Sequence, residues 1–203
     1  MKTCPRTGVA LALALVAVSP GRAADTFDLD QSHFSIVFSV SHMNLSYTYG
    51  FFRQAQGSVV LDKENPANTQ FQLTINADSI DTNEPQRDQH LKSPDFLNVQ
   101  QFPTITFQST SVVLDTRPQQ GIVYQVTGNL TMHGVTRQIV LPIQLMGEGP
   151  GVGGRDYRAG FVSQFELKRS EFGMTNALDM VGDAIGITVS FEAIRQGGAA
   201  PGR

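Results

Sequence analysis

The sequence contains no tryptophan, and its only cysteine, Cys4, is close to the amino terminus. A chain with one cysteine forms no intramolecular disulfide, so packing of the core has to stabilise the fold. After Val18, no apolar run approaches the roughly 20 residues that a membrane-spanning helix needs. These absences exclude a disulfide-rich module and predict a protein that does not span a membrane.

The first residues have the parts of an export signal. Lys2 and Arg6 precede an apolar run at residues 8–18, and small residues surround Ala23. We therefore expect residues 1–23 to be a signal peptide, cleaved after Ala23 or Ala24. Cleavage would remove three of the 15 basic residues and leave 12 against 18 acidic ones, a net charge of −6. Such a charge argues against nucleic acid or anionic lipid headgroups as the main partner.

Apolar and polar residues alternate through most of the remaining chain, which is the period of a strand with one buried face. Turn-forming residues separate the alternating segments, including the glycine-rich stretch 147–154. About eight or nine strands without a long helical pattern predict an all-β protein, an antiparallel barrel or sandwich. We place one domain at residues 24–196 and expect a flexible tail at 197–203. The clearest alternating segments are 34–40, 71–77, 126–132, 139–145, 159–167 and 185–191.

One segment between the predicted strands has helical signals. Asn83 or Glu84 can cap a helix that begins at Pro85 and ends near Lys92. Residues 93–97 begin with Ser-Pro and predict a second turn. We expect this short segment to form a helical cap over one end of a barrel.

An ordered series of short motifs resembles the YceI-like proteins, a family of bacterial periplasmic β-barrels that bind polyisoprenoids. Each motif is weak alone, but their order along most of the chain is specific. The resemblance implies an extended, eight-stranded, antiparallel, lipocalin-like barrel in the periplasm. It also implies a polyisoprenoid or similar long-chain amphiphilic lipid in the barrel lumen. The motifs are residues 30–42, 50–52, 57, 80–82, 87–91, 95–97, 102–103, 128–136 and 181–183.

The inward face of the strands is the candidate lipid site. An eight-stranded barrel is just wide enough to fill with side chains or to hold one slender ligand, and the apolar residues fit either state. The resemblance favours the ligand. Alternation assigns ten residues to the lumen: Phe34, Ile36, Phe38, Val40, Ile75, Phe107, Leu130, Leu141, Phe161 and Phe165.

The polar candidates for a contact with the lipid headgroup lie in the predicted helix. Arg87, Asp88 and His90 would stand near the mouth of the lumen. The alternative is structural, because half-buried charges are usually paired: Arg87 and Asp88 would then pin the helical cap to the barrel through ion pairs and backbone carbonyls. Asp88 can also pair with Lys92, four residues further along the helix.

Signals for catalysis and for metal binding are absent or weak. There is no Gly-x-Ser-x-Gly motif, and the predicted mature chain has no thiol nucleophile. The four histidines, His33, His42, His90 and His133, lie on scattered predicted elements without close ligand spacing, and on one regular strand His33 and His42 would face opposite sides. We therefore predict no catalytic residue, no metal site and no cofactor, with an isoprenoid lipid or quinone as the only bound molecule.

Taken together, the sequence predicts a non-enzymatic carrier. One alternative is an enzyme that acts on an isoprenoid or quinone headgroup, with Asp88 and His90 as acid and base. Another is a scavenger that captures foreign hydrophobic compounds in the same lumen. A third is a packed barrel that works through protein contacts. A homodimer is possible in each case.

Overall fold

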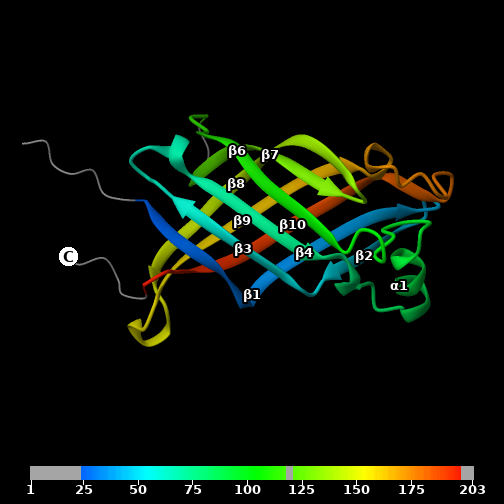
Figure 1. The fold of residues 1–203 in the computed structure, drawn as a ribbon, viewed down its shortest axis with the longest axis horizontal. Coiled ribbons are helices and arrows are strands. Elements are labelled where there is room, and N and C mark those ends of the chain that lie inside the picture. The colour runs from blue at the N-terminus through cyan, green and yellow to red at the C-terminus, as the bar shows by residue number, and fades with distance from the viewer. Residues whose placement is uncertain (1–23, 118–120, 198–203) are drawn as a thin grey trace, which may run out of the picture.

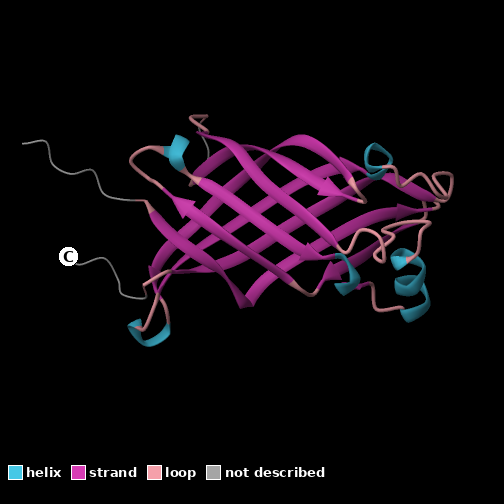
Figure 2. Cartoon of the chain, viewed as in Figure 1, coloured by secondary structure: helices cyan, strands magenta, loops and turns pink. Residues whose placement is uncertain are grey.

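A computed structural model describes residues 24–117 and 121–197 of the protein. The predicted signal peptide, and all of the predicted tail except Gly197, lie outside the described residues. Figures 1 and 2 show an elongated barrel of antiparallel strands with helical segments at its ends. In chain order the strands and the α-helix are β1 (Asp25–His42), β2 (Ser46–Phe52), β3 (Ala55–Leu61), β4 (Gln70–Asn76), β5 (Ile80–Asp81), α1 (Pro85–Lys92), β6 (Thr104–Leu114), β7 (Ile122–Met132), β8 (Val135–Pro150), β9 (Tyr157–Lys168) and β10 (Val181–Arg195).

Eight of these strands form a closed antiparallel barrel, which confirms the predicted fold. The order around the barrel is β1, β3, β4, β6, β7, β8, β9 and β10, and β10 pairs with β1 to close it. The short strands β2 and β5 are additional and extend the sheet beside the second half of β1. No helix among the described residues is long and apolar enough to cross a membrane.

Strand β1 contains a bulge that reverses which residues face inward. Leu29 pairs with Ala193 and Phe34 pairs with Phe191, so six residues of β1 lie opposite three of β10 and the register shifts. Before the bulge the odd-numbered residues Phe27 and Leu29 are buried, whereas after it the even-numbered Ile36 is buried. The bulge therefore lets one strand keep its apolar residues inside along its whole length.

The α1 helix begins and ends at the predicted residues. The Glu84 carboxylate accepts a hydrogen bond from the backbone N–H of Gln86, and Pro85 occupies the first helical position. After Lys92 the chain makes a hydrogen-bonded turn, in which the Phe96 N–H donates to the Ser93 carbonyl. This segment lies at one end of the barrel, near β2 (Figure 1).

The turn predicted at the glycine-rich residues 147–154 has different bounds in the structure. Strand β8 continues to Pro150, and residues 147–150 pair with residues 157–160 of β9. The turn is confined to residues 151–156, where Gly153 and Gly154 have positive φ angles. Glycine-rich sequence favours turns, but pairing with a neighbouring strand keeps Gly147 and Gly149 in the sheet.

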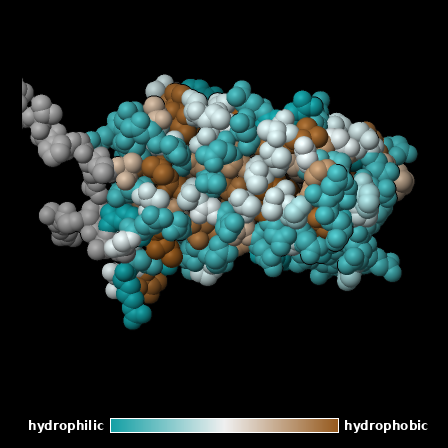
Figure 3. Space-filling model, viewed as in Figure 1, coloured by the Kyte–Doolittle hydropathy of each residue, from teal (hydrophilic) through white to brown (hydrophobic). Residues whose placement is uncertain are grey.

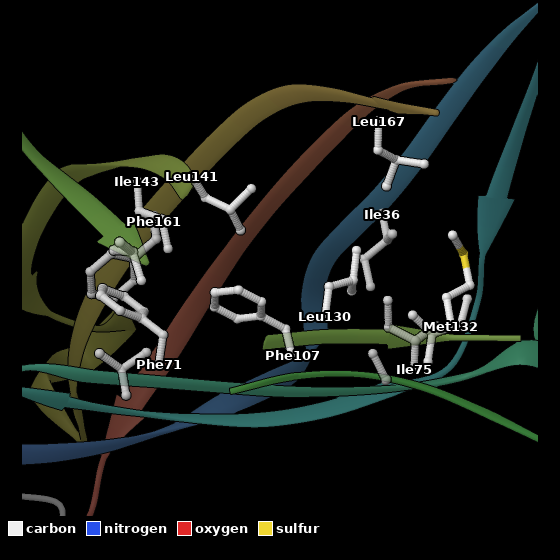
Figure 4. Packing of buried hydrophobic residues seen from close by; sticks show 14 of the residues in the cluster. Ile36, Phe71, Ile75, Phe107, Leu130, Met132, Leu141, Ile143, Phe161 and Leu167 are labelled. Carbon is white, nitrogen blue, oxygen red and sulfur yellow. The ribbon is translucent and has the colours of Figure 1, made fainter. Parts of the chain in front are cut away.

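The apolar core fills the inside of the barrel. The face shown in Figure 3 is mostly hydrophilic, with scattered apolar residues. Inside, side chains from opposite walls point toward one another (Figure 4). Phe71 meets Phe161 edge-to-face with ring centroids 5.6 Å apart, and Phe161 stacks on Phe191 at 5.2 Å. These three rings pack one part of the lumen solidly.

Candidate ligand-binding lumen

The rest of the barrel interior holds a cavity of about 120 Å³. None of the described residues that line it carries a charge, and its lining is almost entirely aliphatic and aromatic. The hydroxyl of Ser163, one of the few polar groups there, donates to the carbonyl of Pro142 at 2.7 Å. Several lining residues, including Phe38, Phe165 and Ile187, are only half-buried although they face inward. These three residues also border a groove on the outside of the barrel, so the wall is thin at their positions.

The structure brings most of the predicted lumen residues together. Phe161 instead belongs to the solid ring cluster, Phe34 packs against the core beside Phe191, and Val40 is half-buried on β1, opposite Ile185. Contact of a ligand with any of them stays a prediction. The seven predicted residues that line the cavity are Ile36, Phe38, Ile75, Phe107, Leu130, Leu141 and Phe165.

Two aromatic rings of the lining lie flat against glycines in the barrel wall. A Cβ atom built at Gly50 would lie 2.3 Å from Cζ of Phe38, its cross-strand partner. A Cβ atom at Gly128 would lie 2.4 Å from Cζ of Phe107. Because glycine has no side chain, each ring occupies the space beside the wall and leaves the centre of the lumen open.

Other lining residues were missed as site candidates by sequence reasoning. Phe52 lies on a short strand with little alternation, and Leu29 precedes the bulge, where its face assignment reverses. Ile187 and Phe191 lie in a segment with clear alternation, from which their position in the lumen could have been predicted. The ring of Phe52 lies 5.8 Å from that of Phe38.

The charged residues predicted near a headgroup are engaged in holding α1. Arg87 donates from Nε to the Thr82 hydroxyl and from Nη2 to the Thr82 carbonyl, both at 2.7 Å. Asp88 Oδ1 accepts from the Thr82 hydroxyl at 2.6 Å and from its N–H at 2.9 Å. These bonds, next to the short strand β5, correspond to the predicted structural role. Contact with a ligand headgroup stays a prediction for these residues.

His90 and Lys92 also have partners outside the lumen lining. His90 Nε2 lies 3.0 Å from Asp95 Oδ2, and its ring meets Phe96 edge-to-face. Lys92 pairs with Asp78 at 3.2 Å rather than with Asp88, so that predicted pair was wrong. The reason is that Asp88 is already bound to Thr82.

A buried arginine orders the chain between β9 and β10. The Arg169 guanidinium donates to the carbonyls of Met174 and Val181 at 2.8 Å and of Gly182 at 3.0 Å. Burial lowers the pKa of Arg169, and the nearby carboxylate of Asp183 opposes that shift. The guanidinium also faces the Phe96 ring at 5.7 Å, which links this segment to the chain that follows α1. Arg169 thereby joins two loops at one end of the barrel.

The bulge of β1 carries a cluster of charged groups on the outside. Ligand atoms of Asp30, His33 and Glu192 lie within 4.8 Å of one another, as a metal site would require. However, Nη1 of Arg158 donates to both Asp30 and Glu192, so a cation already bridges these carboxylates. We therefore interpret the cluster as an ion-pair network that fixes the bulge to β9 and β10.

Asp30 is the most buried member of this network. Burial raises the pKa of Asp30, but hydrogen bonds from His33, Ser32 and Arg158 outweigh it and hold that pKa well below its ordinary range. The carboxylate accepts from the Ser32 N–H at 2.9 Å and from its hydroxyl at 2.7 Å. The charged form of Asp30 is thus part of the folded structure.

A family model and the most similar sequences point to the same protein family. A family model described as the YceI-like domain matches residues 27–193. A UPF0312 protein of Pseudomonas aeruginosa is 39% identical over 189 residues, which cover 93% of this chain and 96% of the relative. Protein YceI of Salmonella newport is 36% identical over 190 residues, with the same coverage of both chains.

Solved structures share the fold at lower identity. BcnA of Burkholderia cenocepacia matches with a TM-score of 0.71 and 21% identity, over 81% of this chain and 98% of that protein. A polyisoprenoid binding domain from Saccharophagus degradans, implicated in plant cell wall breakdown, matches with a TM-score of 0.60. Its identity is 14%, over 86% of this chain and 99% of that domain.

Proposed function

The chain belongs to the YceI-like family, and we propose that it is a periplasmic carrier that holds a polyisoprenoid or similar long-chain lipid in its barrel. The observation that carries this proposal is the uncharged, apolar and incompletely packed lumen. A relative of the same fold, the domain from Saccharophagus degradans, is described as polyisoprenoid-binding. A water-shielding tunnel suits a molecule whose bulk is a hydrocarbon tail.

The energetics of tail burial support a carrier without strong polar contacts. At about 0.8 kcal/mol per buried carbon, one five-carbon isoprene unit contributes roughly 4 kcal/mol before costs are subtracted. Ordering of a flexible tail, and competition from membranes, reduce this gain. Affinity should therefore rise with tail length until the lumen is filled.

The size of the cavity limits the length of tail that the lumen can hold without rearrangement. An apolar cavity of about 150 Å³ takes up one benzene molecule, so a cavity of about 120 Å³ suits a short segment of tail. A longer tail requires the half-buried rings that line the cavity to move. We expect Phe38, Phe52 and Phe165 to be the rings that move, since they are half-buried and the ring cluster around Phe161 is already packed.

The enzyme alternative has less support. Asp88 and His90, its acid and base, bond to Thr82 and Asp95 and are not among the residues that line the cavity. A scavenger of foreign hydrophobic compounds would use the same lumen. Displacement of a resident lipid by a drug-like hydrophobe would favour that alternative.

The proposal can be tested by native mass spectrometry of protein purified from the periplasm without detergent. We expect a stoichiometric bound mass of several hundred daltons or more, which organic extraction would identify as a lipid. A protein free of ligand that also takes up no added isoprenoid would instead support a packed barrel.

Two adjacent substitutions supply a matched control. Phe38→Asp places a carboxylate in the lumen, whereas Ser39→Asp places one on the other face of β1. We expect Phe38→Asp to abolish lipid retention and Ser39→Asp to preserve it, with circular dichroism showing that both variants fold. If both folded variants retain the lipid, the lumen is not its site.

A further inference from the structure

The barrel wall contains a split beside β1. On the side away from β10, residues 25–28 of β1 pair with β3 and residues 36–42 pair with β2. In the described chain, no ladder pairing joins residues 29–35 to the corner between β2 and β3. The bulge of β1 lies in the same stretch, so the backbone there is also displaced from β10. The wall has fewer hydrogen bonds here than elsewhere along β1.

On the lumen side of this split, the barrel wall includes positions with little or no side chain. Gly57 contributes no side chain, and a Cβ atom in its place would lie 2.5 Å from the carbonyl oxygen of Gln72. Four residues, Leu29, Gly57, Ser58 and Gln72, border both the lumen and an outer groove of about 380 Å³. At Gly57 and Ser58, the lumen and the outer groove are thus separated by backbone and one small side chain.

Amide and hydroxyl side chains line the outside of the split. Gln31, Gln56 and Thr74 border this groove and also a neighbouring one of about 410 Å³, so the two are continuous. The only charged residue among the described residues that border either groove is Asp28, whose carboxylate accepts from Gln196 at 3.1 Å. Within the described chain, the Gln31 and Gln56 side chains make no hydrogen bonds and are available to a ligand.

This chemistry discriminates between headgroups. A primary amide offers two donors and one acceptor without charge, which suits a carbonyl, hydroxyl or amide group. A phosphate is held by Arg, Lys or an array of backbone N–H groups, and no cationic side chain is among the described residues that border the groove. The carboxylate of Asp28 would repel an anion.

We propose that the split is the lateral entrance to the lumen, and that an uncharged, hydrogen-bonding headgroup lies in the glutamine-lined groove outside it while the tail lies inside. This inference rests on the proposed carrier function and adds the position and chemical class of the headgroup. It also assigns Gln31 and Gln56 as the residues that bind it.

A set of probes with one tail and different headgroups tests the position. The probes share the saturated hexahydrofarnesyl tail: farnesane is the tail alone, hexahydrofarnesylacetone adds a neutral carbonyl, and hexahydrofarnesyl monophosphate adds a phosphate. We expect the ketone to bind about 10-fold more tightly than farnesane, the effect of one or two hydrogen bonds, and more tightly than the phosphate. Gln31→Leu combined with Gln56→Leu should remove the advantage of the ketone and leave the affinity for farnesane unchanged. Gln86→Leu, on the exposed side of α1, is the matched control and should change neither.

The outcomes separate this inference from the carrier function. If farnesane and the other probes all fail to bind, the carrier function itself is wrong. If farnesane binds and the ketone gains nothing, or the glutamine variant keeps the gain, only the headgroup site is wrong. Tighter binding of the phosphate, lost in Arg87→Gln, would move the headgroup to the α1 end and overturn the inference.

A reversible cross-link tests the entrance. Cysteines at positions 31 and 56, on opposite sides of the split, would be joined by a reducible linker in a chain with Cys4 replaced by serine. We expect loading of hexahydrofarnesylacetone to slow at least 10-fold and to recover on reduction. An unchanged loading rate would exclude entry through the split.

Discussion

The ring of Phe38 lies against Gly50, its partner across the β1–β2 ladder, so that a β-carbon on Gly50 would collide with Cζ of the ring. The ring of Phe107 on β6 likewise lies against Gly128 on β7, which is diagonal to it because Gly128 pairs with Ser109. In both cases the wall makes room for an aromatic ring that would otherwise occupy the lumen. The open space inside the barrel thus depends on residues that have no side chain.

The first prediction concerns this space. In Gly50→Ala, the new methyl group should push the Phe38 ring into the lumen, because the methyl also meets Thr82 at 2.8 Å. We expect lipid affinity to fall about 10-fold and stability to fall by about 1–3 kcal/mol, the usual cost of overpacking. Isothermal titration with an isoprenoid and urea unfolding would measure the two effects. Gly147→Ala is the control, since nothing lies within 4 Å of that position, and equal losses in both variants would contradict the prediction.

The second prediction concerns how the free energy of unfolding decreases at acid pH. The pKa of Asp30 is depressed in the folded protein, so its carboxylate stabilises the fold above the unfolded-state pKa of about 4. That contribution is lost as the pH falls from about 4 toward the folded-state pKa. Asp30→Asn should therefore cost about 1–3 kcal/mol at pH 7, since Arg158 loses a charged partner.

Urea unfolding at pH 7, 5 and 3 would check this pH dependence. The gap between wild type and Asp30→Asn should be constant from pH 7 to 5 and narrower at pH 3. Asp179→Asn, at an exposed position, should leave stability within about 0.5 kcal/mol of wild type at pH 7. A gap for Asp30→Asn that stays the same at pH 3 would show that its charge is not responsible.

The third prediction concerns Arg169, whose guanidinium holds three backbone carbonyls. Arg169→Met leaves these acceptors without a donor and should cost about 3 kcal/mol or more, whereas Arg169→Lys should recover part of the loss. Limited proteolysis should become faster within residues 173–180, because the loop is no longer tied to the barrel end. Arg155→Met, at an exposed position, should change neither quantity. Intact protection of the loop in Arg169→Met would contradict this role.

The fourth prediction separates two roles for the residues of α1. Thr82→Val removes the hydroxyl that donates to Asp88 and accepts from Arg87, with little change in shape. We expect a loss of about 1–3 kcal/mol and faster hydrogen exchange in α1. Lipid affinity should stay within twofold if the residues only hold the helix. A large loss of affinity in the folded variant would indicate that this end of the barrel contacts the ligand.

Local signals in the sequence were sufficient for several elements. The extent of α1 followed from Glu84, Pro85 and the Ser-Pro pair after Lys92, because capping depends on neighbouring residues only. Alternation likewise identified the inward side of β7, where Leu130 lines the cavity. The number of such strands predicted an antiparallel barrel or sandwich, and the choice of an eight-stranded barrel followed from the family resemblance.

Features set by distant residues could not be predicted. Arg158 meets Asp30 across 128 positions of sequence, and only the fold brings them together. The bulge of β1 reverses the inward face between Leu29 and Phe34, so alternation read from one half does not carry to the other. Phe161 and Phe165 have the same periodicity, yet one is packed among rings and the other faces the cavity. That difference depends on what lies across the lumen.

The pairing of β1 with β10 joins the beginning of the domain to its end. Such a ladder is the most non-local contact that a chain can make, and topologies of this kind fold slowly. Until β10 is available, the edges of β1 and β9 both present unpaired backbone groups, which can pair with another chain. A polypeptide that ends before β10 would keep those two edges permanently. Truncation at this end should therefore produce aggregation rather than a smaller folded barrel.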